Sequence, residues 1–269
     1  MTLPRPPLAP HDRAVALKGV CRQFSGYTAV EDITFDIAPG RFISLVGPSG
    51  CGKSTVLNMI AGLLAPTAGV VEVFGRPLAG INRRACYMFQ DDALLPWKTV
   101  LANIQLGLTF RGRRGREALD EANKWIDRVG LEGFGDRYPS QLSGGMRKRV
   151  AMAQAWIVQP DLILMDEPFG ALDVHTRLRM EAEILSLWTE SRPTVIFVTH
   201  DLDEAISLSD EVLLLSAGPR SRLMGRYAVD LPRPRNLIDI KMEPRFHELF
   251  RSIWSDLRQE VLKSYQRHA

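Results

Sequence analysis

The sequence predicts an α/β protein with a mixed, mainly parallel sheet, an antiparallel β subdomain before it and a helical subdomain inserted in it. Continuous apolar runs at 42–46, 162–165 and 195–199 are typical of parallel strands that are covered on both faces. A turn and a helical pattern follow each run, so we expect a ligand at the carboxyl ends of these strands. Alternation of apolar and polar residues over 33–37 indicates an antiparallel strand with one wet face.

Helical patterns occupy about residues 94–158 and the last part of the chain. Apolar residues recur at helical spacing over 118–129, and Gly130 then supplies a left-handed stop. Beyond the PRPR run, one apolar face of a final amphipathic helix, which packs on its own chain or on a partner, contains Leu249, Phe250, Ile253, Trp254, Leu257 and Val261. The expected organisation is a disordered tail, a main domain and a helical extension, over residues 1–13, 14–232 and 233–269.

Composition and charge limit the possible functions. The 269 residues include 34 Lys and Arg against 31 Asp and Glu, and this small excess gives no indication of a nucleic-acid partner. Three widely separated cysteines, Cys21, Cys51 and Cys86, favour a reducing compartment. The chain begins without a signal pattern, and its apolar runs are shorter than the roughly 18 to 20 residues of a membrane helix. We therefore expect a cytosolic protein, and any membrane span would come from another polypeptide.

A glycine-rich motif directly follows the expected strand 42–46 and precedes a helical stretch at 54–64. Its sequence, GPSGCGKS, matches G-x-x-x-x-G-K-[ST], whose backbone N–H groups cradle phosphates. Lys53 is expected to reach the β- and γ-phosphates and Ser54 to bind Mg²⁺. The motif predicts a P-loop NTPase core, with a plain strand-to-helix turn as the alternative. The expected nucleotide-binding residues are Gly47, Pro48, Ser49, Gly50, Cys51, Gly52, Lys53, Ser54 and Thr55.

Cys51 occupies a free position of this motif. It is either a spacer or a thiol that makes the site sensitive to oxidation.

Two adjacent carboxylates, Asp166 and Glu167, end the apolar strand 162–165. A charge at such a position needs a cation, because the apolar lead-in excludes unpaired charge. Asp166 is placed to hold Mg²⁺ through water, and Glu167 to act as the general base on an attacking water. The alternative is a strand end followed by a turn at Pro168.

Two further segments carry weaker signals. His200 follows another apolar strand. At such a position a surface histidine is a more common interpretation than a phosphate contact. Asp201 with Glu204 indicates a capping box. Ser143 with Gly144 and Gly145 precedes a helical stretch, so Ser143 is an expected N-cap. A bare helix start is also an anion site, and a simple cap is the alternative.

The motifs GPSGCGKST, LSGGMRKR, LILMDEPFGALD and VTHD, in this order, resemble the nucleotide-binding subunits of ATP-binding cassette (ABC) transporters over about residues 14–232. The resemblance implies an ABC nucleotide-binding domain that dimerises head to tail. Each ATP would lie between the phosphate loop of one cassette and the LSGG segment of the other. Ser143, Gly144 and Gly145 would then contact the γ-phosphate bound by the other cassette.

The same resemblance assigns roles to several further residues. Asp173 would lie in the loop that crosses the dimer, and His200 would contact the γ-phosphate as a switch. Gln90 would contact Mg²⁺ and water and sense the membrane subunit. Phe24 would stack on adenine, although Tyr27 competes for this role and Phe24 is nearly as well explained as a core or turn aromatic.

The loop after Gln90, DDALLPW at 91–97, exposes apolar side chains and is expected to form a groove for a membrane partner's helix. An interior position of Trp97 in the helical subdomain is the alternative. The LPW element, DEPFGALDVHTR and LPRPR resemble the importer branch that serves nitrate, alkanesulfonates and taurine. Several residues depart from the pattern common in relatives: Met146, Lys148, Gln154 and Trp156.

Together these features predict an ATPase that uses ATP and Mg²⁺. Its expected catalytic residues are Glu167, His200, Lys53 and Gln90, and its expected metal-binding residues are Ser54, Gln90 and Asp166. We expect a homodimer on the cytoplasmic face of the inner membrane, working with permease subunits and indirectly with a solute-binding protein. A soluble ABC ATPase unconnected with transport is the alternative, whereas intact Glu167 and His200 argue against a non-hydrolysing regulatory protein.

Overall fold

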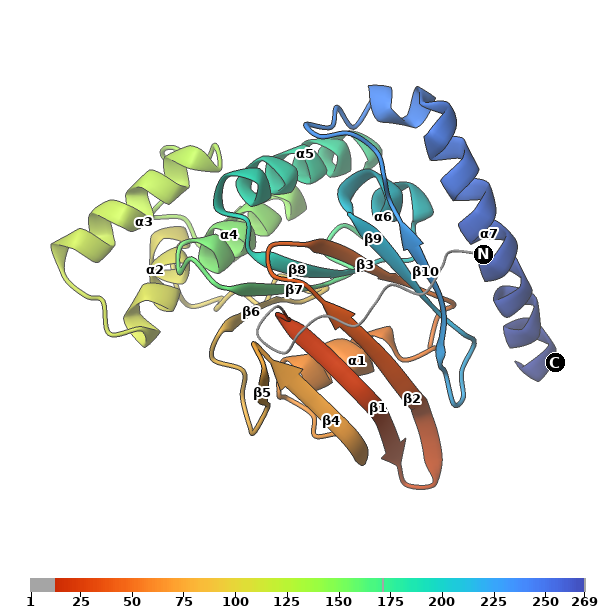
Figure 1. Ribbon diagram of the computed structural model, residues 1–269. Coiled ribbons are helices and arrows are strands. Elements are labelled where there is room, and N and C mark those ends of the chain that lie inside the picture. The colour runs from red at the N-terminus through yellow and green to blue at the C-terminus, as the bar shows by residue number, and fades with distance from the viewer. Residues whose placement is uncertain (1–12, 171, 269) are drawn as a thin grey trace.

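The computed structural model describes residues 13–170 and 172–268, which form two sheets with helices around them (Figure 1). The α/β prediction is confirmed. Apart from Arg13, the tail expected at 1–13 lies outside the described residues.

The larger sheet has six strands and is parallel except at one edge. From edge to edge its strands are β10 (Leu223–Ala228), β9 (Glu211–Leu215), β3 (Phe42–Val46), β8 (Thr194–Val198), β7 (Leu162–Asp166) and β6 (Ala85–Met88). Only β10 runs antiparallel to its neighbour. All residues of β3 and β8 are buried because the sheet is covered on both faces, as their continuous apolar runs predict.

The smaller sheet is antiparallel and comes mostly from the beginning of the chain. Its order is β2 (Tyr27–Ile37), β1 (Val15–Phe24), β4 (Ala68–Val73) and β5 (Arg76–Pro77). Ile33, Phe35 and Ile37 of β2 are buried, as the alternation in the sequence predicts. Their face shares one hydrophobic core with Ile43 and Leu45 of β3, so the two sheets pack on each other through α1 (Lys53–Ile60).

α1 is shorter than the helical stretch expected at 54–64. It ends at Ile60, and Gly62 then adopts a positive φ of 71°. A Cβ at Gly62 would lie 1.9 Å from the carbonyl oxygen of Gly80, so a close backbone approach requires glycine here.

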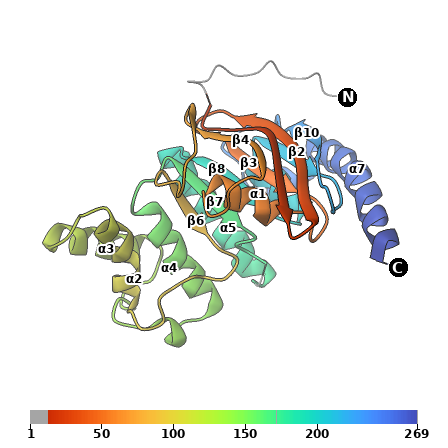
Figure 2. The same cartoon turned by 90° about the horizontal axis from the view of Figure 1, so that it is seen from below.

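Three helices lie between β6 and β7 in the chain: α2 (Val100–Phe110), α3 (Arg116–Arg128) and α4 (Gly144–Trp156), with a short 3₁₀ helix, η2 (Pro139–Gln141). Figure 2 shows them on one side of the sheets. Ala118, Ala122, Trp125 and Ile126 of α3 are buried, and Gly130 has the expected left-handed conformation with φ at 66°. α5 (Val174–Ser191) joins α4 over the opposite face of the large sheet from α1 (Figure 1).

The chain ends in a 3₁₀ helix, η3 (Asp239–Met242), and the long helix α7 (Pro244–His268). α7 packs on its own chain, against α6 (Leu202–Leu208) and the β9 strand, through Phe246, Leu249, Ile253 and Leu257. Trp254 is 47% exposed, so its expected place on the apolar face is wrong. Its ring stacks on Phe250, which is itself partly buried against the core beside α6.

Candidate functional site

The phosphate loop joins β3 to α1 at the carboxyl edge of the large sheet. Gly52 is the N-cap of α1 and has a left-handed backbone, with φ at 97° and ψ at 16°. A Cβ at this position would lie 2.6 Å from Cγ1 of Val30, so only glycine fits both the conformation and the space. The turn directs the free N–H groups of the helix start toward the loop.

Lys53 is buried inside this loop. Its Nζ atom donates hydrogen bonds to the carbonyl oxygens of Gly47 at 2.9 Å and Pro48 at 3.0 Å. Phosphate oxygens are stronger acceptors for an ammonium than neutral carbonyls. The loop therefore holds a cation beside a helix N-terminus, which fits a polyphosphate.

The remaining loop residues differ in exposure. Pro48 and Cys51 are buried, Thr55 is half-buried on α1, and Ser49 and Gly50 are exposed. Burial raises the pKa of the Cys51 thiol, which keeps it protonated, so the structure favours Cys51 as a spacer over an oxidation-sensitive thiol.

Ser54 and Asp166 lie together beside the loop. The Ser54 hydroxyl donates to Oδ1 of Asp166 at 3.0 Å, and the Tyr87 hydroxyl donates to Oδ2 at 3.1 Å. Burial and the neighbouring Asp166 carboxylate raise the pKa of Tyr87, so its hydroxyl keeps the donated proton. A hydroxyl and a carboxylate are oxygen ligands that Mg²⁺ prefers, so the two side chains fit this cation.

Sequence reasoning did not single out Tyr87. It lies on β6 opposite Leu164 of β7, and this pairing brings it to Asp166 two positions further along β7. The register of two strands that are far apart in the chain is not visible in either strand's own pattern.

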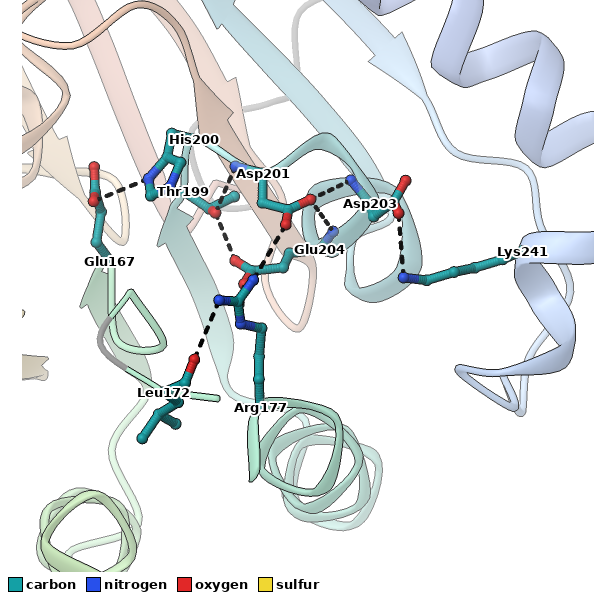
Figure 3. A network of polar contacts seen from close by, with 9 residues as sticks. All are labelled: Glu167, Leu172, Arg177, Thr199, His200, Asp201, Asp203, Glu204 and Lys241. Carbon is teal, nitrogen blue, oxygen red and sulfur yellow. Dashed lines mark hydrogen bonds and ion pairs between the residues drawn. The ribbon is translucent and has the colours of Figure 1, made fainter. Parts of the chain in front are cut away.

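Glu167 and His200 follow the neighbouring strands β7 and β8 and meet at the same edge (Figure 3). Nδ1 of His200 lies 3.1 Å from Oε2 of Glu167. Glu167 has a positive φ of 44°, which costs on the order of 1–3 kcal/mol for a residue with a side chain. Its N–H donates to the carbonyl of Val198, and this bond holds the strained turn on β8.

The turn after His200 is only partly the expected capping box. Asp201 caps α6 by accepting hydrogen bonds from the N–H groups of Asp203 and Glu204. The Glu204 carboxylate does not return to the N–H of Asp201, which donates to Thr199 Oγ1 instead. The Glu204 carboxylate instead accepts a 2.6 Å hydrogen bond from the Thr199 hydroxyl. That hydroxyl therefore lies between Asp201 and Glu204.

Gln90 lies two residues beyond the end of β6, which ends at Met88. Its side chain is exposed, and its carbonyl accepts a hydrogen bond from Lys148 of α4. Lys148 is buried and also pairs with Asp92 at 3.1 Å. Lys148, one of the residues that depart from the family's pattern, therefore ties the loop after Gln90 to the helical subdomain.

Trp97, in the same loop, is 71% exposed, so the interpretation that it is an interior residue is wrong. Phe89, before the loop, is also exposed. The segment therefore presents aromatic surface beside Gln90.

Ser143, Gly144 and Gly145 form the start of α4, and Ser143 is its N-cap, as expected. The Ser143 hydroxyl accepts a bond from the N–H of Met146 at 3.3 Å. Within the described part of the chain, no hydrogen bond joins Ser143 to the phosphate loop. A single chain therefore leaves this helix start apart from the other site residues.

Asp173 is the exposed N-cap of α5 and accepts a hydrogen bond from the N–H of Thr176, which lowers the pKa of Asp173. A Cβ at Gly145 would lie 2.8 Å from Cγ2 of Thr176, so the start of α4 packs closely on the start of α5.

Phe24 and Tyr27 face each other across the turn between β1 and β2, and both are exposed. The Arg22 guanidinium lies over the Phe24 ring at 4.5 Å. The Tyr27 hydroxyl is close to Gly218, which in turn lies against Gly50 of the phosphate loop. Both aromatics therefore remain candidates for an adenine contact.

Residues 30–170 match the model of the family described as "ABC transporter". The chain belongs to the ABC transporter family. An uncharacterized ABC transporter ATP-binding protein, MJ0412 of Methanocaldococcus jannaschii, is 44% identical over 88% of this chain and 86% of its own length. The taurine import ATP-binding protein TauB of Yersinia pestis is 42% identical over 76% of this chain and 80% of TauB. The nitrate import ATP-binding protein NrtC of Synechococcus elongatus is 42% identical over 87% of this chain but 36% of NrtC.

The solved dimeric structure of MJ0796, a bacterial ABC transporter cassette, has a TM-score of 0.72 and 31% identity. It covers 81% of this ABC protein and 100% of the MJ0796 chain. A second MJ0796 structure is a dimeric post-hydrolysis state bound to ADP and Pi. The predictions of the family, of an ATPase and of ATP with Mg²⁺ as its cofactors are confirmed. None of this ABC protein's described helices is long and apolar enough to cross a membrane.

Proposed function

We propose that this ABC protein is the ATP-hydrolysing subunit of an importer and works as a head-to-tail homodimer. The observation that carries the proposal is the meeting of Lys53, Ser54–Asp166 and Glu167–His200 at one sheet edge, while the Ser143 helix start stays apart. One edge supplies the groups that phosphoryl transfer needs, and the separate helix start supplies a second anion site.

The phosphates bind to the N–H groups of the loop at 47–52, to Lys53 and to the start of α1, where Thr55 lies. Ser54, Asp166 and Gln90 would hold Mg²⁺, which would supply positive charge to neutralise the phosphate oxygens. Phe24 or Tyr27 stacks on adenine, and both are exposed enough to do so.

Glu167 accepts the proton of the attacking water. His200, its partner in the pair, contacts the γ-phosphate. The 3.1 Å contact between them orients the Glu167 carboxylate before a substrate arrives. His200 is mostly exposed, so it is accessible to a phosphate group. Catalysis therefore consists mainly of positioning and charge neutralisation.

The second half of each site comes from the other cassette. Ser143, Gly144 and Gly145 of one chain contact the γ-phosphate held by the other chain, and Asp173 lies in the loop that crosses the dimer. The two glycines at the start of α4 leave its N-terminus without bulky side chains, and this supports the assignment. The dimeric state of the MJ0796 cassette supports it as well.

Coupling to transport uses the loop after Gln90. Its exposed Trp97, together with the exposed Phe89 just before Gln90, forms a docking surface for permease subunits on the cytoplasmic face of the membrane. The names of TauB and NrtC support uptake of a small solute such as taurine, nitrate or a sulfonate. A solute-binding protein would deliver that solute to the permease.

Nucleotide binding and phosphate release by the purified chain with Mg·ATP test the proposal. Lys53→Ala should weaken ATP binding by at least about tenfold, since a charge-assisted contact is lost. Lys124→Ala, an exposed lysine on α3, is the control and should bind as the wild type does. Equal binding by both variants would contradict the phosphate site.

A further inference from the structure

Arg177, in the first turn of α5, lies between the loop that follows Glu167 and the turn that carries His200 (Figure 3). One end of its guanidinium, Nη2, donates to the carbonyl of Leu172 at 3.3 Å. The other, Nη1, donates to Oδ2 of Asp201 at 3.4 Å. A single side chain therefore joins two segments that approach the site from different strands.

The carboxylate of Glu204 is the second partner on the His200 side. It is 3.6 Å from Nε of Arg177, and its other oxygen accepts the Thr199 hydroxyl. The Glu204 side chain is 8% exposed, so its charge depends on a nearby cation. Arg177 therefore pairs with a buried carboxylate that is hydrogen-bonded to Thr199, the residue before His200.

A cavity of about 10 Å³, with room for about one water molecule, is lined by both Arg177 and the Glu167–His200 pair. Its walls are Glu167, Gly170, Arg177, Thr199, His200 and Glu204. Nε of Arg177 is buried, and within residues 13–170 and 172–268 it makes no hydrogen bond. Arg177 therefore lines the same small cavity as the catalytic pair.

We propose that Arg177 is a positioning residue for the Glu167–His200 pair, because it fixes the loop at Leu172 against the turn at Asp201 and Glu204. The role rests on the function proposed above, in which that pair acts on the attacking water and the γ-phosphate. Arg177 itself does not touch the reacting atoms. Its planar fork suits the task, because it can bond a carbonyl and two carboxylates in one fixed geometry.

The test compares Arg177→Gln with Arg179→Gln, a change at an exposed arginine of the same helix. Turnover, KM for ATP, ATP affinity and thermal unfolding are measured on the full chain. Turnover is followed over a range of protein concentrations, so that weaker dimerisation is seen separately from a lower plateau. We expect Arg177→Gln to lower kcat by about 10- to 100-fold and to leave ATP affinity within about threefold. Arg179→Gln should match the wild type.

Two further variants separate positioning from simple stabilisation. Arg177→Lys keeps a positive charge for Glu204 but loses the planar guanidinium. Its kcat should therefore be higher than that of Arg177→Gln and lower than that of the wild type. Glu204→Gln keeps an acceptor for the Thr199 hydroxyl, and it should lower kcat about 3- to 10-fold with ATP affinity retained. Glu204→Gln also provides the test if Arg177→Gln does not fold.

Unchanged kcat in Arg177→Gln and Glu204→Gln would overturn the proposal. So would a parallel fall in kcat, ATP affinity and melting temperature with no recovery in Arg177→Lys, since that pattern indicates a purely structural ion pair. The proposed function has its own readout in the turnover of the wild type and its loss in Glu167→Gln. Normal wild-type turnover with no effect at Arg177 would therefore reject only the positioning role, whereas a wild type without turnover would reject both.

Discussion

Nδ1 of His200 lies 3.1 Å from Oε2 of Glu167, although the two residues are 33 positions apart in the chain. They meet because β7 and β8 are parallel neighbours, and both residues follow the carboxyl ends of those strands. Glu167 has a strained backbone at this edge, with φ at 44°. The contact places both side chains together at the carboxyl edge of the large sheet.

Replacing Glu167 by glutamine should abolish turnover without removing ATP binding. Glutamine keeps the shape of the side chain but cannot accept the proton of the attacking water, so we expect kcat to fall by about 10²- to 10⁴-fold. Phosphate release and ATP affinity measure the two effects. Glu117→Gln, at an exposed position of α3, is the control. Normal hydrolysis by the Glu167 variant would reject the general-base assignment.

Replacing Tyr87 by phenylalanine should raise the Mg²⁺ concentration needed for half-maximal turnover by about 3- to 10-fold. The change removes the hydroxyl that donates to Oδ2 of Asp166, and a single hydrogen bond to a charged group is worth about 1 kcal/mol or more. A Mg²⁺ titration measures the effect, and Tyr138→Phe at an exposed site is the control. Chelation of Mg²⁺ should stop turnover in every variant. An unchanged titration curve would mean that Tyr87 does not orient the metal ligand.

Stability should fall with rising pH through the ionisation of Glu181 on α5. Burial raises the pKa of Glu181 to about 7, and the neighbouring carboxylates of Glu204 and Asp201 add to the rise, opposed by Lys241 and Arg177. The unfolded carboxyl titrates near pH 4.3, so the stabilisation from protonated Glu181 is complete below that pH and is lost as the pH rises through 7.

Glu181→Gln should remove this loss, because glutamine does not ionise. Urea unfolding at pH 5 and pH 8 measures it. We expect the free energy of unfolding of the variant, relative to wild type, to be higher at pH 8 than at pH 5 by on the order of 1–3 kcal/mol. The same difference at both pH values would show that Glu181 is not the titrating group.

Two leucines of α7 provide a matched test of its packing. Leu257 is buried against the α6 side of the protein, whereas Leu262 is 51% exposed. Leu257→Ala should lower the free energy of unfolding by about 2–4 kcal/mol, and Leu262→Ala by less than about 0.5 kcal/mol. Equal losses in denaturant unfolding would mean that α7 does not pack through the Leu257 face.

Local patterns in the sequence predict the parts of the site that lie on single segments. The strand, glycine loop and helix around Lys53 form a continuous motif, and Asp166 with Glu167 interrupts an apolar run, so both are visible without a structure. Tyr87 and Arg177 carry no such signal. Each reaches the site through a contact between segments distant in the chain, Tyr87 across a strand pairing and Arg177 across the start of α6.

The long final helix shows the same limit. The amphipathic pattern predicts α7 and most of its buried face, but α7 covers only α6 and its neighbours, so Trp254 remains outside the contact.

In the proposed dimer, Gly47–Ser54 of one chain and Ser143–Gly145 of another complete one ATPase site. The measurement that tests it most directly is the ATP turnover rate per chain across protein concentrations from the dilute range upward. We expect the rate per chain to rise with concentration and to reach a plateau as dimers form. A rate per chain that stays constant through the dilute range, with no dimer detected by sedimentation in the presence of ATP, would contradict it.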